Sequence, residues 1–243
     1  MENEWDEDDA ATYDDSQWEE FQPATIEATV DFLADNARGG RALELGVGTG
    51  RIALPLAARG INVSGIDLSE PMVAKLKQKP GGADIDVTIG DFSTTRAKGS
   101  FSLAYLVYNT IENLTTQEEQ VACFRNVAAH LEPGGRFVIE VGVPGLQRLP
   151  VGETYQVFHG SDDYWGVDEY DVVNQGLISH HVENVDGRYE RSSGTFRYVW
   201  PSELDLMARI AGMELRERWQ DWRREPFTSE SRKHVSVWEK PSA

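Results

Sequence analysis

A nine-residue stretch, residues 42–50 (ALELGVGTG), constrains the fold of this chain more than any other. A short apolar run leads into it, and glycines then stand at alternate positions from Gly46 to Gly50. Glycine weakens a strand, and the apolar residues of 51–58 recur with the spacing of a buried helix. The stretch therefore predicts a strand, a tight loop and a helix in direct succession.

The glycines of this loop favour a ligand site. A residue without a Cβ adopts dihedral angles that are closed to other residues and lets a ligand approach the backbone closely. The N–H groups at the start of the next helix would favour a negatively charged group of that ligand. We therefore expect a small-molecule site at the end of this strand; the alternative is a glycine-rich turn that binds nothing.

The spacing of the glycines bears on the class of ligand. Dinucleotide-binding loops read G-x-G-x-x-G and are followed by an acid that holds a ribose hydroxyl. Here the third glycine comes one residue early, and Arg51 stands where that motif has glycine. Glu44, just before the loop, would repel a pyrophosphate but suits a ligand with a cationic group. A nicotinamide-dependent oxidoreductase is therefore the less favoured alternative.

The pattern E-x-G-x-G-x-G resembles motif I of the class I S-adenosylmethionine-dependent methyltransferases. The cofactor of that family carries an ammonium and a sulfonium group, which an acid beside the loop would attract. The resemblance implies S-adenosylmethionine as cofactor and a Rossmann-like, doubly wound α/β sheet of seven strands. The cofactor-binding residues that it implies in the loop are Glu44, Gly46, Val47, Gly48 and Gly50.

An acid follows the second predicted strand, residues 61–66. This acid, Asp67, lies within a predicted βαβ unit, where its carboxylate would accept hydrogen bonds from the ribose hydroxyls of an adenosine. The adjacent Leu68 belongs to the same expected site. The alternative is a charge at a helix N-terminus, because Ser69 and Pro71 form a helix-start signal.

The third predicted strand, residues 85–89, ends at Gly90, Asp91 and Phe92. In the resembled family an acid at this place receives the adenine amino group, and its neighbour offers backbone and apolar contact. The resemblance thus implies Asp91 and Phe92 as cofactor-binding residues. Gly-Asp alone would be only a turn signal.

The fourth predicted strand, residues 101–107, is followed by a loop that begins at Tyr108. Loops at the carboxyl ends of strands bind ligands in open α/β sheets, so we expect Tyr108 to line the methionine moiety or the acceptor. Asn109 and Glu112 are further candidates for acceptor contacts, although both residue types also serve as turn residues and caps.

A capping box at Thr116 predicts a helix that continues to Leu131, and residues 132–135 end it. Residues 136–141 then form the fifth strand. This strict alternation of strand and helix predicts a parallel sheet. A helix at residues 204–211 and strands at 213–219 and 235–238 complete the chain; in the resembled family these last strands form an antiparallel pair.

Between the fifth strand and the last helix the pattern changes to short strand-forming runs. Asp186-Gly187 between alternating segments indicates a tight hairpin, so we expect an inserted antiparallel sheet. Sugar-nucleotide amino-group methyltransferases carry such a sheet beside the active site, where it contributes to acceptor binding or dimer contacts. That resemblance makes a homodimer an expectation.

The chain is thereby divided into four expected parts. They are an acidic arm or lid (1–22), the S-adenosylmethionine-binding core (23–145), the antiparallel insertion (146–200), and the C-terminal helix with the last two strands (201–243). Residues 1–20 hold no Lys or Arg, which is typical of a solvated, partly disordered tail. Aromatic residues interrupt this segment, however, and Tyr13-Asp14 resembles the pair with which many class I methyltransferases cover the cofactor.

The formal net charge of −18 disfavours two classes of partner. Nucleic-acid phosphates and anionic membranes would be repelled, and no basic patch compensates. The single cysteine, Cys123, allows no internal disulfide, and no apolar run resembles a signal peptide or is long enough to span a bilayer. We expect a cytoplasmic protein without nucleic-acid or membrane partners and without a metal ion.

Methyl transfer from a sulfonium requires a nucleophile held close to the methyl group and the exclusion of water. A base is needed mainly for hydroxyl or ammonium acceptors. The candidate bases are Glu140, His159, His180 and His181, each of which also has an ordinary structural explanation. We expect the acceptor to be a small metabolite methylated at nitrogen or oxygen; a non-catalytic methyltransferase-like scaffold is the remaining alternative.

Overall fold

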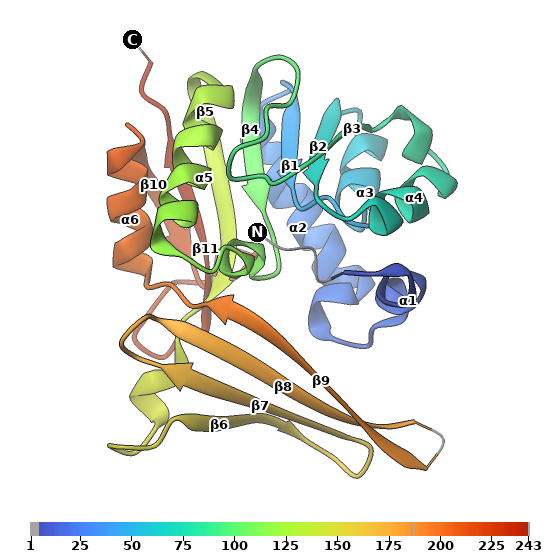
Figure 1. Ribbon diagram of the computed structural model, residues 1–243. Helices are drawn as coiled ribbons and strands as arrows, with labels where there is room; N and C mark the ends of the chain where they lie inside the picture. The colour runs from blue at the N-terminus through green and yellow to red at the C-terminus, as the bar shows by residue number, and fades with distance from the viewer. Residues whose placement is uncertain (1–4, 186, 243) are drawn as a thin grey trace.

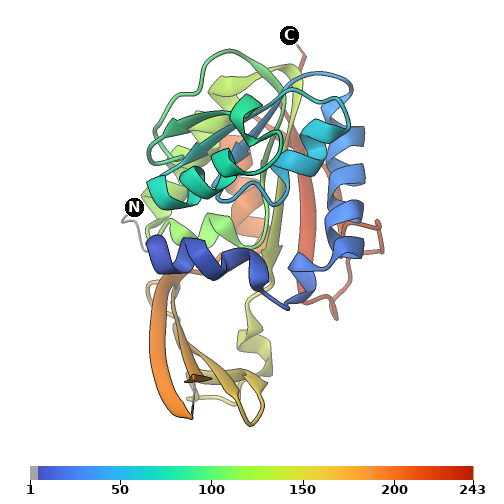
Figure 2. The ribbon, with the colours of Figure 1, turned by 90° about the vertical axis from the view of Figure 1, so that its right-hand side faces the viewer.

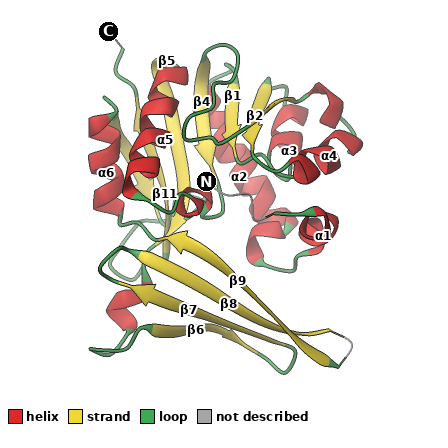
Figure 3. Ribbon diagram, viewed as in Figure 1, coloured by secondary structure: helices red, strands yellow, loops and turns green. Residues whose placement is uncertain are grey.

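The computed structural model describes residues 5–185 and 187–242 and contains two separate sheets (Figures 1 and 3). The larger sheet has seven strands in the order β10-β11-β5-β4-β1-β2-β3. Strands β1 to β5 pair in parallel, whereas β11 runs antiparallel to both β5 and β10. The predicted fold class is confirmed, including the final antiparallel pair. The strands are β1 (Ala42–Leu45), β2 (Val63–Asp67), β3 (Asp86–Ile89), β4 (Phe101–Leu106), β5 (Leu131–Gly142), β10 (Glu214–Trp219) and β11 (Lys233–Glu239).

Helices cover both faces of this sheet and bury an apolar core on each. Phe32 and Leu56, from α2 and α3, belong to one core cluster. Phe124 and Leu204, from α5 and α6, belong to the cluster on the opposite face. The helices of the core are α2 (Pro23–Ala37), α3 (Ala53–Ala58), α4 (Glu70–Gln78), α5 (Gln117–His130) and α6 (Pro201–Ile210).

The transition from α5 to β5 differs from the prediction. The capping box is present, since the Thr116 hydroxyl accepts the Glu119 N–H at 3.2 Å and the Glu119 carboxylate accepts the Thr116 N–H at 3.0 Å. The helix ends at His130, however, and Leu131 already belongs to β5. The reason is the long pairing of β5 with its neighbours: Leu131 is in register with Phe101 of β4, and the irregular segment behind it remains part of the strand.

The second sheet is the predicted insertion after the fifth strand, and it is entirely antiparallel. In Figure 1 it lies below the core, facing the carboxyl end of β4. The hairpin between β8 and β9 has the predicted place, but its residue Asp186 lies outside the described residues. The strands are β6 (Tyr155–Gly160), β7 (Tyr164–Asp171), β8 (Gly176–Val185) and β9 (Arg188–Arg197).

The N-terminal arm is folded from Trp5 onward and includes α1 (Glu7–Thr12), which Figure 2 shows lying across the boundary between core and insertion. Polar contacts tie the arm to the core beside the glycine loop. The Thr49 hydroxyl donates to Asp14 at 2.7 Å, and the Ser69 hydroxyl donates to the Trp5 carbonyl at 2.9 Å. These described residues are therefore positioned at the strand ends. None of the helices in residues 5–185 and 187–242 is both long and apolar enough to cross a bilayer.

Candidate functional site

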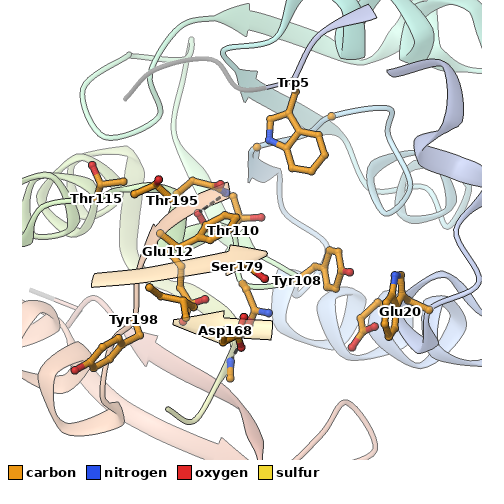
Figure 4. Close-up of a pocket in the computed structure, with 18 of the residues that line it drawn as sticks. Trp5, Glu20, Tyr108, Thr110, Glu112, Thr115, Asp168, Ser179, Thr195 and Tyr198 are labelled. Carbon is orange, nitrogen blue, oxygen red and sulfur yellow. Dashed lines mark hydrogen bonds between the residues drawn. The ribbon is translucent and has the colours of Figure 1, made fainter. Parts of the chain in front are cut away.

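A pocket of about 930 Å³ opens where the carboxyl ends of the core strands, the arm and the insertion sheet meet (Figure 4). This volume is at the upper end of the range for ligand sites, so it offers room for a cofactor together with an acceptor. Most of the residues expected at the cofactor line this pocket; these are Tyr13, Gly46, Gly48, Asp67, Leu68, Phe92 and Tyr108. The other four expected residues are not part of its lining, namely Glu44, Val47, Gly50 and Asp91.

The three loop glycines serve different purposes, although all have positive φ angles. A Cβ on Gly46 would lie 2.7 Å from the Thr110 methyl group, and one on Gly50 would lie 2.1 Å from Leu76. A Cβ on Gly48 would meet nothing within 4 Å, and Gly48 lines the pocket. Gly46 and Gly50 are thus required by packing, whereas Gly48 keeps open the space that a ligand needs.

Three N–H groups of the loop, which precedes the helix start where a negative group of the ligand was expected, donate to protein acceptors. Those of Gly46 and Val47 donate to the Ile66 carbonyl at 2.8 and 3.2 Å. The N–H of Gly48 donates to the Asp67 carboxylate at 2.6 Å. The physical reason is that β1 and β2 are neighbours, so the anion held by this loop is the protein's own Asp67.

Asp67 also accepts the Ser69 N–H at 2.8 Å, and the Leu68 N–H is a third backbone donor to its carboxylate. Burial raises the pKa of Asp67, and the N–H donors of Ser69 and Gly48 oppose that rise. A carboxylate has about four lone-pair sites, so these donors leave capacity for a ribose hydroxyl in the pocket. Ser69 additionally caps α4, as its sequence signal predicted. The residues present therefore fit the adenosine part of S-adenosylmethionine.

Two acids expected at the cofactor have protein partners behind the pocket wall. Glu44 is buried and accepts the Tyr105 hydroxyl at 3.0 Å, and burial raises its pKa to about 8. Asp91 accepts the Ser93 N–H at 2.7 Å. Direct contacts of Glu44 and Asp91 with the cofactor therefore stay predictions, as do those of the buried Val47.

The candidate base Glu140 holds the loop after β4 in place. Tyr108 and Asn109 both have left-handed backbones, with φ of 55° and 60°. The Glu140 carboxylate accepts the Tyr108 N–H at 3.1 Å and the Trp222 indole N–H at 3.0 Å, and it lies 3.7 Å from the Lys233 ammonium. Glu140 is not among the residues that line the large pocket. Its geometry is that of a positioning residue behind Tyr108.

This arrangement predicts that Glu140→Ala lowers the free energy of unfolding by about 3 kcal/mol, because it leaves Lys233 and two N–H donors without their partner. Urea denaturation measures the loss. If Glu140 were instead the base for methyl transfer, the variant would keep its stability and its cofactor binding while losing activity.

Among the candidate histidines, His181 lines the pocket, where its Nδ1 contacts the Tyr164 hydroxyl. Burial lowers the pKa of His181, which favours the neutral imidazole. His180 points to the other side of the sheet and pairs with Glu169 at 3.2 Å. His159 packs edge-on against Trp18, with ring centroids 5.4 Å apart. The structure therefore places His181 alone of these three at the pocket.

Apart from His181, the side chains with which β7 and β8 line the pocket were not identified from the sequence. They alternate along β7 and β8, where every second residue faces the pocket. The alternation of side chains along each strand would have identified these residues, but only if the face of the sheet that is turned to the core had been known. The pocket-facing residues of the two strands are Tyr164, Asp168, Tyr170, Leu177, Ser179 and His181.

The pocket lining is acidic and aromatic. Among the described residues that line it, none is Lys or Arg. Aromatic rings and carboxylates together attract cations, the former through the negative faces of the rings. The acids are Glu20, Asp67, Glu112, Glu119 and Asp168, and the aromatic residues include Trp5, Trp18, Phe158, Tyr170 and Tyr198.

Known proteins are similar to this chain in sequence and in fold. A family model described as a methyltransferase domain matches residues 42–135. The cypemycin N-terminal methyltransferase of a Streptomyces species is 30% identical over 207 residues, which cover 83% of this chain and 84% of that protein.

Solved structures agree with this assignment. The CcbJ methyltransferase of Streptomyces caelestis is 36% identical, with a TM-score of 0.85 and 96% of each chain covered. CalS10, an amino pentose methyltransferase of Micromonospora echinaspora solved with S-adenosylmethionine bound, shares the fold at 20% identity, with a TM-score of 0.69 and 99% of each chain covered. The glycine loop, the strand order and these relatives together show that the chain belongs to the class I S-adenosylmethionine-dependent methyltransferases.

Proposed function

We propose that this methyltransferase transfers a methyl group to an amine nitrogen of a small metabolite. The observation that carries the proposal is the acidic, aromatic lining of the pocket, with no Lys or Arg among its described residues. An amine reaches the site largely as an ammonium ion at neutral pH, and such a lining attracts it. An alcohol acceptor carries no charge, so the negative charge of these acids does not attract it in the same way.

The relatives support the same class of acceptor. The cypemycin enzyme is named for methylation at an N-terminus, and CalS10 is described as acting on an amino pentose. These acceptors differ in size but share an amine. The chemistry common to them, rather than any one of these substrates, is what we carry over to this chain.

The pocket divides between cofactor and acceptor along its two walls. We assign the loop at Gly48, Asp67 and Leu68, together with Phe92 and Tyr13, to the cofactor. The acceptor then lies toward the insertion sheet, between the residues after β4 and those of β7 and β8. S-adenosylmethionine supplies an electrophilic methyl group on sulfur, and an attacking nitrogen forms its new N–C bond as the C–S bond breaks with both electrons kept by sulfur.

Selective blocking of amines tests the proposal. The enzyme is incubated with methyl-labelled S-adenosylmethionine and a pooled metabolite extract, either untreated or treated with an amine-selective acetylating reagent. We expect labelled products from the untreated extract and a loss of at least about tenfold after acetylation, since an amide nitrogen is neither cationic nor nucleophilic. Mass spectrometry places the methyl group. Undiminished labelling after acetylation, or a product methylated on oxygen, would contradict the proposal.

A further inference from the structure

Glu112 presents a carboxyl group to the pocket after β4. Glu112 lies in the 3₁₀ turn Thr110–Asn113 after β4, is only 9% exposed, and lines the pocket. Among the described residues, none donates a hydrogen bond to this carboxyl or forms an ion pair with it. A buried carboxyl without a partner is costly and calls for an explanation. A ligand in the pocket that brings a donor or a positive charge would supply one.

A second acid, Asp168, acts electrostatically on Glu112 from across the boundary between core and insertion. Asp168 belongs to β7, and Figure 4 shows both residues in the same part of the pocket. Burial first, and then the charge of Asp168, raises the pKa of Glu112 to about 8. Burial also raises the pKa of Asp168, which the Ser179 hydroxyl opposes by donating to it. Neighbouring buried carboxylates repel each other unless a proton or a cation accompanies them.

We infer that Glu112, with Asp168 beside it, binds the ammonium group of the acceptor and that Glu112 takes its proton before methyl transfer. This inference rests on the proposed function and names the catalytic residue for it. A divalent cation is the less favoured occupant, because no group of three or more His, Cys, Asp or Glu side chains suited to a metal occurs among the described residues.

The proton balance explains why a base is needed. An ammonium nitrogen has no free electron pair, so it must lose one proton before it can attack. The carboxylate of Glu112 accepts that proton and becomes a carboxylic acid, which leaves a neutral amine. The nitrogen then gains a methyl group and becomes an ammonium ion again. Glu112 returns its proton to solvent when the product leaves, and the site is restored.

The matched pKa favours this transfer. A base works best when its pKa lies near the operating pH, and burial with Asp168 brings Glu112 into that range. The two acids also come from different parts of the fold. An ammonium between them would therefore contact both the insertion and the loop after β4. Asp168 thus faces the ammonium and, through its charge, also raises the pKa of Glu112.

Sinefungin tests the site without knowledge of the acceptor. In this cofactor analogue a carbon bearing an amino group replaces the sulfur bearing the methyl group, so its ammonium projects toward the acceptor. S-adenosylhomocysteine is the matched ligand without that ammonium. We expect the wild-type protein to bind sinefungin at least about tenfold more tightly by calorimetry, and Glu112→Gln to remove this preference while leaving S-adenosylhomocysteine affinity unchanged. Glu118→Gln, an exposed position in the first turn of α5, should keep it.

The pH dependence of the preference for sinefungin over S-adenosylhomocysteine tests whether Glu112 carries the proton. Below pH 8 the free protein holds a proton on Glu112, which must leave before the carboxylate can pair with an ammonium. The preference should therefore rise with pH, by up to about tenfold per unit, and level off above pH 8. In Glu112→Gln the preference for sinefungin should no longer change with pH. Asp168→Asn removes the charge that raises the pKa of Glu112, so it shifts the slope to lower pH.

The outcomes separate this inference from the proposed function. A wild-type protein without the preference, or a Glu112→Gln protein that keeps both preference and slope, would overturn the role of Glu112. Amine acceptors found by the acetylation experiment would leave the proposed function standing in that case. If Glu112→Gln failed to bind S-adenosylhomocysteine, the Asp168→Asn variant would decide alone. A rise of the sinefungin preference that begins at lower pH would support the inference, and an unchanged pH dependence would reject it.

Discussion

Gly48→Val is expected to abolish the binding of S-adenosylmethionine while leaving the protein folded. A Cβ at this position meets no protein atom within 4 Å, so the added side chain enters the pocket rather than the core. It occupies the space beside Asp67 in which we place the adenosine. We expect affinity to fall by at least about 100-fold in a calorimetric titration, because the ligand and the side chain cannot share that space.

Backbone strain must be separated from this steric effect. Gly48 has a φ of 51°, which a β-branched residue adopts only at a cost. Gly212 provides the matched control: its φ is 79°, a Cβ there also meets nothing within 4 Å, and it lies outside the pocket after α6. Gly212→Val should lose similar stability and keep its cofactor affinity. Equal losses of affinity in both variants would show that strain, not occupation of the pocket, is responsible.

The core of the fold was predictable because its signals are local. Apolar runs that end in glycine or an acid mark the strands, and the capping box at Thr116 marks the start of α5. The early third glycine of the loop favoured S-adenosylmethionine over a dinucleotide as cofactor, and the similarity to methyltransferases agrees with that prediction. Such features depend on a few neighbouring residues and on backbone chemistry that is the same in every protein.

The partners of the loop were not predictable in the same way. The sequence did not indicate that the Gly48 N–H donates to the Asp67 carboxylate. That bond joins residues on neighbouring parallel strands, and its geometry depends on their register. Likewise, Glu44 accepts from Tyr105 on β4, which only the strand order brings beside it.

The acceptor side depends even more on tertiary structure. Glu112 was a plausible acceptor contact by sequence, but its burial depends on tertiary packing, in which β9 of the insertion contacts the turn that carries it. Asp168 gave no signal at all, since an acid on a strand is ordinarily solvent-exposed. The alternation of β7 becomes informative only when the pocket-facing side of the sheet is known.

Asp67→Asn should weaken cofactor binding by at least about 100-fold, because one residue supports both the loop and the ribose. Its two carboxylate oxygens accept the N–H groups of Gly48 and Ser69 at 2.6 and 2.8 Å. An amide has a single acceptor oxygen, so its NH₂ group would face one of these donors. Asp86→Asn, an exposed acid at the start of the neighbouring β3, is the matched control and should bind as the wild type does.

The pH dependence of cofactor affinity gives a second, independent readout of Asp67. Burial raises the pKa of this carboxyl above its ordinary value, so protonation begins at a higher pH than for an exposed Asp. Protonation removes one acceptor, and cofactor affinity should therefore fall as the pH drops through that raised pKa. In Asp67→Asn this acidic limb disappears, because the amide does not titrate. Calorimetric titrations between pH 8 and pH 5 compare the two proteins, and an acidic limb that persists in the variant would assign the titration to another acid of the pocket.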